Sequence, residues 1–263
     1  MAAIATADIS SEQRAGNRVA HAPPSTPLGP RRDVIRIFEA EPDLVADLDQ
    51  RTAAFLTQRV VAPKLWVKPG PWEPPSRDAQ TSRSLGLLVI DGFLLRTLEL
   101  RGRRCPELVG PGDVLRPWDD IESVADGASW TALDGASIAV LDEQFCAIGA
   151  RWPSIIAQLL TRSIQRSRSL AVNLAIVHVR HADLRLHMLL WQLAERWARV
   201  TTDGVHLPIR LTHEMLGDLA CMRRPTASSA LSVLVRRGEV VRRDDGTWLL
   251  TGPPPSAQVG AGG

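Results

Sequence analysis

The chain has 263 residues and a mass of 28.7 kDa, which is enough for two domains. Apolar residues make up 44% and charged residues 23%, a composition that excludes a wholly disordered chain. No window reaches the roughly 18 consecutive apolar residues of a membrane span, and the first residues lack the pattern of a secretory signal, so we expect a cytoplasmic protein.

The formal net charge of +2 is divided unevenly along the chain. Residues 1–150 carry 16 Lys and Arg against 21 Asp and Glu, whereas residues 151–263 carry 15 Arg against 8 acids. The halves therefore hold −5 and +7, and the basic half predicts contact with a polyanion. Cys105, Cys146 and Cys221 are scattered and odd in number, which predicts neither a disulfide framework nor a metal site.

The first half of the chain predicts short strands after one helix. Residues 1–32 and 253–263 are poor in apolar sequence, so we expect disordered tails there. Apolar residues at helical spacing predict a helix over 34–56. From about 59 to 141, β-rich runs alternate with glycine turns, which favours an antiparallel β-roll or jelly roll. Asp91-Gly92 lies between two such runs and predicts a hairpin with a type I′ turn, and Arg101-Gly102 and residues 110–113 predict further turns.

Pro153 can open a long helix because its missing N–H costs nothing in the first turn. Alternating steps of four and three residues, with five of eight positions apolar, form a coiled-coil seam: Ile156, Leu160, Ser163, Ser167, Leu170, Leu174, Val177 and His181. We therefore expect residues 153–182 to pair with a second copy; a helix packed on its own core is the alternative. A second helix is expected over 184–199, with Asp183 as its N-cap.

Residues 183–252 predict a winged helix-turn-helix. Thr212 can cap a first helix, and after a short break a second helix begins at Arg224-Pro225, since proline suits only a first turn. The second helix has an apolar face at helical spacing, formed by Ala227, Ala230, Leu231 and Leu234. Two short strands around Asp245-Gly246 then form a hairpin, the wing.

The outer face of the second helix is suited to DNA. It carries small hydroxyls and arginine, with no acid between Arg223 and Arg237. Small side chains allow close approach to a major groove, and an arginine at the helix start can reach guanine O6 and N7. The candidate DNA-contacting residues are Arg223, Arg224, Pro225, Thr226, Ser228, Ser229, Arg236, Arg242 and Arg243. A non-DNA-binding adaptor that retains the helix-turn-helix is the alternative, but the basic half favours DNA.

The chain resembles the Crp/Fnr family of bacterial transcription regulators over residues 33–252. The matching stretches are residues 85–93, 108–115, 185–194, 211–220 and 223–231. The resemblance implies an α+β protein with a cyclic-nucleotide-binding-like β-roll over 33–152, a dimerisation helix over 153–182 and a winged helix-turn-helix over 183–252. It also implies a homodimer that binds a pseudo-palindromic operator in double-stranded DNA, with RNA polymerase as a partner.

By the same resemblance, Arg224, Pro225 and Ser229 correspond to the family's base-reading positions, and Arg223 and Thr226 to its phosphate-contacting ones. Pro225 and Ser229 replace the usual acidic and arginine readers, so the family's operator does not transfer. Cys221 stands where the family's inter-helix turn usually has glycine, which predicts strain in that turn.

The sensor half departs further from the family. Its cyclic-nucleotide cassette reads Arg116-Pro-Trp-Asp-Asp120, and residues 117–150 contain seven acids and no Arg or Lys. A cyclic phosphate would lack a counter-charge there, so we do not expect a cyclic nucleotide bound in the family's manner. A haem or other small-molecule sensor of the same fold is the alternative. We expect no metal, cofactor or catalytic residue, because no second zincin histidine follows His213-Glu214 and no P-loop or nucleophile elbow is present.

Overall fold

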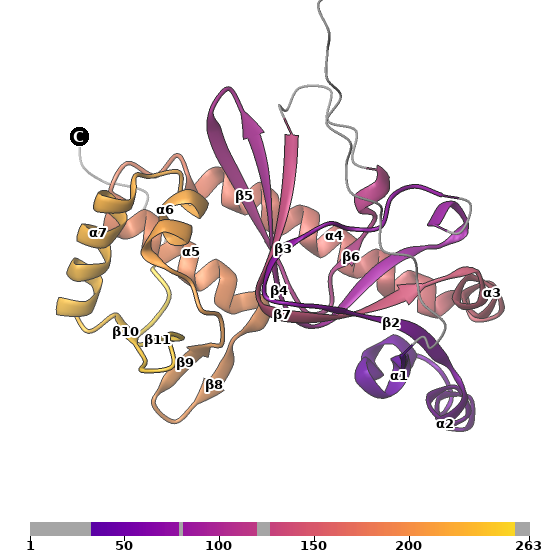
Figure 1. Cartoon of the computed structure of the whole chain (residues 1–263). Coiled ribbons are helices and arrows are strands. Elements are labelled where there is room, and N and C mark those ends of the chain that lie inside the picture. The colour runs from indigo at the N-terminus through magenta and orange to yellow at the C-terminus, as the bar shows by residue number, and fades with distance from the viewer. Residues whose placement is uncertain (1–32, 79–80, 120–126, 256–263) are drawn as a thin grey trace, which may run out of the picture.

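The computed structural model describes residues 33–78, 81–119 and 127–255. It is an α+β protein in which a β-rich N-terminal part, a long helix and a C-terminal unit of helices and short strands follow one another (Figure 1). Within these residues, no helix has the length and apolar character needed to span a membrane. The expected tail at 1–32, most of the tail at 253–263, and the cassette residues 120–126 lie outside the described residues.

The helix expected over 34–56 is wrong as a single element. The segment forms strand β1 (Val34–Arg36), helix α1 (Ile37–Ala40), a 3-10 turn η1 (Pro42–Val45) and helix α2 (Gln50–Arg59). The proline at the start of η1 cannot continue α1, and Asp49 starts α2 by accepting hydrogen bonds from the amides of Arg51 and Thr52 at 3.1 Å. The apolar spacing reflects burial of Ile37, Phe38 and Leu44 in one core despite this break.

The predicted antiparallel β-roll is confirmed. Its strands are β2 (Val61–Val67), β3 (Gly70–Trp72), β4 (Gly86–Leu100), β5 (Arg103–Val109), β6 (Val114–Leu115) and β7 (Gly127–Leu141), with 3-10 turns η2 (Thr81–Arg83) and η3 (Pro117–Asp119). The sheet runs β1-β2-β7-β4-β5, and β3 pairs with β7 while β6 pairs with β4. The long strands β4 and β7 pair along nearly their whole length and form the body of the roll.

Asp91-Gly92 is a β-bulge in β4, so the hairpin expected there is wrong. The register against β7 shifts on both sides of this pair of residues. Gly92 has φ +84, and a Cβ on it would lie 2.0 Å from the carbonyl oxygen of Gly135 in β7. The positive φ that could have made a turn instead bends the strand and lets two backbones approach closely. The turn predicted at Arg101-Gly102 is confirmed: it joins β4 to β5, with φ of 48 and 73.

Three helices follow the roll: α3 (Glu143–Arg151), α4 (Pro153–Ile176) and α5 (Ala182–Trp197), of which α5 belongs to the core of the C-terminal unit. Helix α4 opens at Pro153 as expected but ends at Ile176, so Val177 and His181 lie beyond the helix. Helix α5 starts earlier than predicted, because His181 and not Asp183 is its N-cap. The Asp183 carboxylate accepts a hydrogen bond from Arg237 Nη1 at 3.0 Å.

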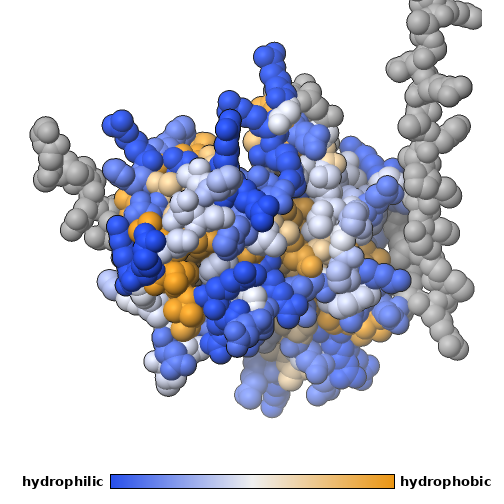
Figure 2. Space-filling view, turned by 60° about the vertical axis from the view of Figure 1, so that its left-hand side comes forward, coloured by the Kyte–Doolittle hydropathy of each residue, from blue (hydrophilic) through white to orange (hydrophobic). Residues whose placement is uncertain are grey.

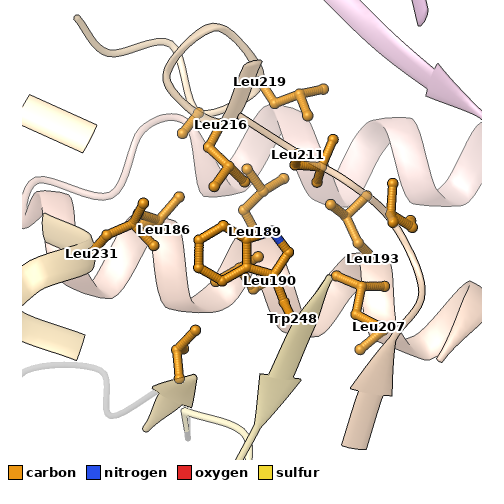
Figure 3. Close-up of a cluster of buried hydrophobic side chains, with 14 of the residues drawn as sticks. Leu186, Leu189, Leu190, Leu193, Leu207, Leu211, Leu216, Leu219, Leu231 and Trp248 are labelled. Carbon is orange, nitrogen blue, oxygen red and sulfur yellow. The ribbon is translucent and has the colours of Figure 1, made fainter. Parts of the chain in front are cut away.

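The C-terminal unit contains strands β8 (Arg199–Thr201) and β9 (Gly204–Leu207), helices α6 (His213–Leu219) and α7 (Arg224–Arg236), and strands β10 (Val240–Arg242) and β11 (Trp248–Leu250). Its sheet has the order β10-β11-β9-β8. The leucines of α5 pack around Trp248 together with leucines of α6, α7 and β9 (Figure 3). Strands β8 and β9 are not predicted from the sequence because they are short, and all of β8 is exposed and gives no apolar alternation.

Candidate nucleic-acid interface

Helices α6 and α7 are held together by local features of the sequence. Thr212 caps α6, its Oγ1 accepting a hydrogen bond from the amide of Met215 at 3.2 Å. A Cβ on Gly217 would lie 2.9 Å from the carbonyl oxygen of Met222, so glycine allows the inter-helix turn to pack on α6. The predicted inner face of α7, formed by Ala227, Ala230, Leu231 and Leu234, is buried. This packing turns the opposite face of α7 outward.

The outward face of α7 carries most of the predicted DNA-contacting residues. Exposed positions on and beside this helix are Arg223, Arg224, Pro225, Thr226, Ser229, Ser232 and Arg236. Within the described residues, no ion pair ties Arg223, Arg224 or Arg236 to an acid. Figure 2, which brings this side of the molecule forward, shows a mostly hydrophilic surface with apolar patches between. The guanidinium groups are therefore available to an external anion.

Ser228 is placed differently from its neighbours. It is half-buried, and its Oγ lies 3.0 Å from His213 Nδ1 on α6. Burial lowers the pKa of His213, and the positive charges of Arg242 and Arg224 lower it further. A neutral His213 thus joins α6 to α7 beside two predicted DNA contacts. Sequence spacing carried no signal for this contact, because His213 is distant from Ser228 in the chain.

The wing forms at the predicted Asp245-Gly246 turn. Gly246 has φ +84, and Asp245 accepts hydrogen bonds from the amide and hydroxyl of Thr247 at 2.9 and 2.6 Å. Arg242 and Arg243 are both exposed, and the Arg242 guanidinium lies 5.8 Å from the centre of the Trp248 ring. Arg242 of the wing and Arg224 of α7 are the two positive charges that lower the pKa of His213, so both lie near this histidine.

The interior of the β-roll is filled by side chains. Trp72 and Trp130 meet edge to face with ring centroids 5.8 Å apart, and Trp130 is buried in the roll's apolar core. Arg116, the cation nearest the cassette, donates to the Ser84 carbonyl at 3.3 Å and lies over the Trp118 ring. Both observations weigh against a phosphate site within the described part of the roll.

Asp113, which follows the glycine turn between β5 and β6, is buried and faces α5. Its carboxylate forms an ion pair with Arg196 of α5 and accepts a hydrogen bond from the Gly110 amide at 2.9 Å. Burial raises the pKa of Asp113, and the charge of Arg196 opposes that shift. This residue connects the β-roll to α5, whose leucines pack into the C-terminal unit.

Helix α4 exposes several residues of the predicted seam. Leu160, Leu170 and Leu174 are 59%, 43% and 65% exposed, and the neighbouring Ile164 is 44% exposed. Ile156 is half-buried, packed close to Gly149 of α3. The apolar side chains that do pack against the protein's own core are Ile155, Leu159 and Ile176, on a different face. The chain therefore leaves one apolar face of α4 uncovered.

Comparison with known proteins agrees with this architecture. Residues 184–251 match the family model of the Crp-like helix-turn-helix domain. No curated protein matches the chain. Among solved structures, FixK2 from Bradyrhizobium japonicum is 18% identical with a TM-score of 0.56, covering 73% of this chain and 94% of that one. A CRP-family transcriptional regulator from Thermus thermophilus is 18% identical with a TM-score of 0.51, covering 72% and 91%.

A cyclic nucleotide-binding domain containing protein from Listeria monocytogenes is 15% identical with a TM-score of 0.59, covering 82% of this chain and 97% of that one. At such identities these likenesses concern the fold, whereas the helix-turn-helix is matched by its own family model. The chain thus carries a Crp-like helix-turn-helix domain within the overall fold of the Crp/Fnr family of transcription regulators.

Proposed function

We propose that the protein is a homodimeric, sequence-specific DNA-binding transcription regulator. The observation that carries this proposal is the exposed, acid-free outer face of α7, with Arg224 in its first turn, together with the exposed Arg242 and Arg243 of the wing. In a symmetric dimer two such helices would read a pseudo-palindrome whose half-sites lie about one helical turn apart in adjacent major grooves. In the same proposal residues 33–152 form the sensor and 153–182 the dimer helix.

Arginine substitutions at the start of α7 test this proposal. We expect Arg224→Ala to weaken specific DNA binding by about 1–3 kcal/mol and to relax base preference at one base pair per half-site. The reason is that the Arg224 guanidinium can bind the O6 and N7 atoms of a guanine. Arg223→Ala should weaken binding to all DNA sequences alike. It should also reduce the slope of log affinity against log salt concentration by about one per protomer. The measurement is binding titration across salt concentrations and operator variants, on an operator obtained by genomic binding-site selection.

Arg59→Ala is the matched control, since it removes an arginine from α2 in the sensor part and should leave DNA binding unchanged. Full sequence discrimination in Arg224→Ala would mean that α7 does not read bases. Absence of salt-dependent binding to any duplex would favour the adaptor alternative.

A small-molecule sensor of the same fold is the second candidate, favoured by one observation. A polar cleft lies between the β5–β6 turn, α4 and α5, lined by charged residues that include Glu41, Arg162, Arg168, Glu195 and Arg196. A ligand there would touch both the sensor part and α5 of the DNA-binding part. Its test is a thermal-shift screen of charged metabolites on the wild type and on Arg168→Ala, and an absorption spectrum tests for haem.

A further inference from the structure

The structure brings together two cysteines that the sequence separates. Strand β5, which contains Cys105, packs against α6, and Cys221 lies in the turn directly after α6. Arg104 Nη1 lies 3.2 Å from Asp218 Oδ2 and 3.5 Å from Glu214 Oε1, both on α6. Arg104 directly precedes Cys105, and the Asp218 carbonyl accepts a hydrogen bond from the Cys221 amide at 3.1 Å. This ion pair therefore links the neighbour of Cys105 to a residue that is hydrogen-bonded to Cys221.

The two thiols lie on neighbouring parts of the fold, Cys105 on β5 and Cys221 in the turn after α6, the helix that β5 contacts. Burial raises the pKa of the Cys221 thiol and the neighbouring Cys105 thiol raises it further, while Arg185 and Arg103 oppose the shift. Both residues are exposed at the surface and hold no disulfide. Cys146 is placed elsewhere, with its Sγ 3.6 Å from the Arg83 carbonyl of the sensor part. Two of the three cysteines therefore form a pair, and the third provides a control.

The backbone at Cys221 adds an independent observation. Cys221 has φ +49, a conformation that favours glycine over any residue with a side chain. Arg185 Nη1 donates to the carbonyls of Ala220 and Cys221 at 3.2 and 3.4 Å and so fixes the turn. The chain thus carries a thiol at a strained and rigidly held position near Cys105, and such strain is typical of sites with a function.

We propose that Cys105 and Cys221 form a reversible disulfide that ties the β4–β5 hairpin to the inter-helix turn, with a small disulfide such as oxidised glutathione as the oxidant. The Cys105 thiolate attacks one sulfur of the small disulfide, giving a mixed disulfide and releasing one small thiolate. The Cys221 thiol then loses its proton to solvent, and its thiolate displaces the second small thiolate. The two protein thiols are oxidised by two electrons, and the small disulfide is reduced to two thiols.

The order of attack follows from the environment of Cys221. Burial raises the pKa of the Cys221 thiol and lowers its thiolate fraction, so we assign Cys221 the second, resolving step. Disulfides in reducing compartments are mostly transient and redox-sensing, and an exposed pair fits that use. The consequence for DNA rests on the proposed function: a tie to β5 restricts the movement of α6 and α7 relative to the roll, and a dimer needs that movement to match its half-sites.

The chemical test uses the full chain, as wild type and as Cys105→Ser, Cys221→Ser and Cys146→Ser. Each protein is treated with oxidised glutathione, alkylated and mapped by mass spectrometry without reduction. We expect a linked Cys105–Cys221 peptide in the wild type and in Cys146→Ser, within one chain and lost on adding dithiothreitol. Stable glutathione adducts on both residues, a link to Cys146, or a link between chains would each overturn the proposal.

The functional test compares DNA affinity before and after oxidation. We expect oxidation to weaken the wild type and Cys146→Ser by at least about fivefold, the lower range of typical coupling between sites, and to leave Cys221→Ser unchanged. A linked Cys105–Cys221 peptide without a change in DNA affinity would refute the proposal that this disulfide controls DNA binding. Failure of the reduced protein to bind DNA would refute the proposed function and leave the disulfide to be judged by the peptide map.

Discussion

A buried, titratable side chain makes the stability of the C-terminal unit depend on pH. This side chain is His187 of α5: it is 6% exposed, and its Nε2 accepts a hydrogen bond from Trp191 Nε1 at 3.0 Å. Its Nδ1 lies 3.9 Å from Glu239 Oε2, next to the end of α7. Burial lowers the pKa of His187, and the charge of Glu239 opposes that shift only in part. The folded chain therefore favours the neutral imidazole.

We expect this histidine to make the C-terminal unit less stable in acid. Because the folded pKa lies below the unfolded value, its contribution is fully present above about pH 6.5 and is lost as the pH falls from there toward the folded pKa. The measurement is the free energy of unfolding from neutral to mildly acidic pH, for the wild type and for His187→Gln, which keeps an acceptor for Trp191. The wild type should lose more stability over this interval. Parallel curves for the two proteins would contradict the assignment.

The positive φ of Cys221 predicts a gain in stability on substitution by glycine. We expect Cys221→Gly to raise the free energy of unfolding by about 0.5–1 kcal/mol, since glycine removes the Cβ strain but adds backbone freedom to the unfolded chain. Arg101→Gly, at the other described non-glycine residue with positive φ, should behave in the same way. Cys146→Gly lies inside α3 and should destabilise by a similar amount. The three values come from urea denaturation of the reduced proteins.

At the scale of elements, the sequence predicted individual helices and turns better than the contacts between elements that are distant in the chain. The inner face of α7, its Pro225 start and the Asp245-Gly246 wing follow from local rules, and the structure has all three. The type I′ turn predicted at Asp91-Gly92 required positive φ at both residues, and only Gly92 has it. Whether the chain reverses there depends on pairing with β7, which is distant in sequence. The contact of Ser228 with His213 and the packing of β5, which contains Cys105, against α6 likewise depend on tertiary structure and could not be predicted.

The exposed apolar face of helix α4 predicts a dimer. Its exposed leucines, Leu160, Leu170 and Leu174, share one face with Ile164, and burying each against a second copy contributes about 1.5–3 kcal/mol before the cost of association. We expect the double variant Leu170→Glu with Leu174→Glu to sediment as a monomer at micromolar concentration, whereas the wild type sediments as a dimer. Val172→Glu is the control, because Val172 is 48% exposed on another face of α4. A wild-type monomer at micromolar concentration would refute the seam.

At the scale of the whole molecule, the β-roll and the C-terminal unit are joined by specific contacts. Trp197 Nε1 donates to the Pro111 carbonyl at 3.2 Å, and the Trp197 ring meets Phe93 edge to face with centroids 5.4 Å apart. Arg210 Nη1 and Asp134 Oδ1 form an exposed ion pair at 3.1 Å. Together with the buried pair of Asp113 and Arg196, these contacts attach the turns of the roll to α5 and the segment after it. A change in the roll can therefore reach the helix-turn-helix through packed side chains.

A cyclic nucleotide in the roll is not expected to start such a change. We expect neither cyclic AMP nor cyclic GMP to bind there, because Trp130 is buried in the roll's apolar core against Trp72 and Arg116 is bound to the Ser84 carbonyl. The sequence of residues 117–150 also offers no Arg or Lys to a cyclic phosphate, and an anion buried without a cation is costly. Isothermal titration of the full chain with each nucleotide, at low and at physiological salt, should give no saturable heat. Micromolar affinity that persists in Trp130→Ala would place the nucleotide outside the roll, and micromolar affinity abolished by Arg116→Ala would show that the cassette binds phosphate after all.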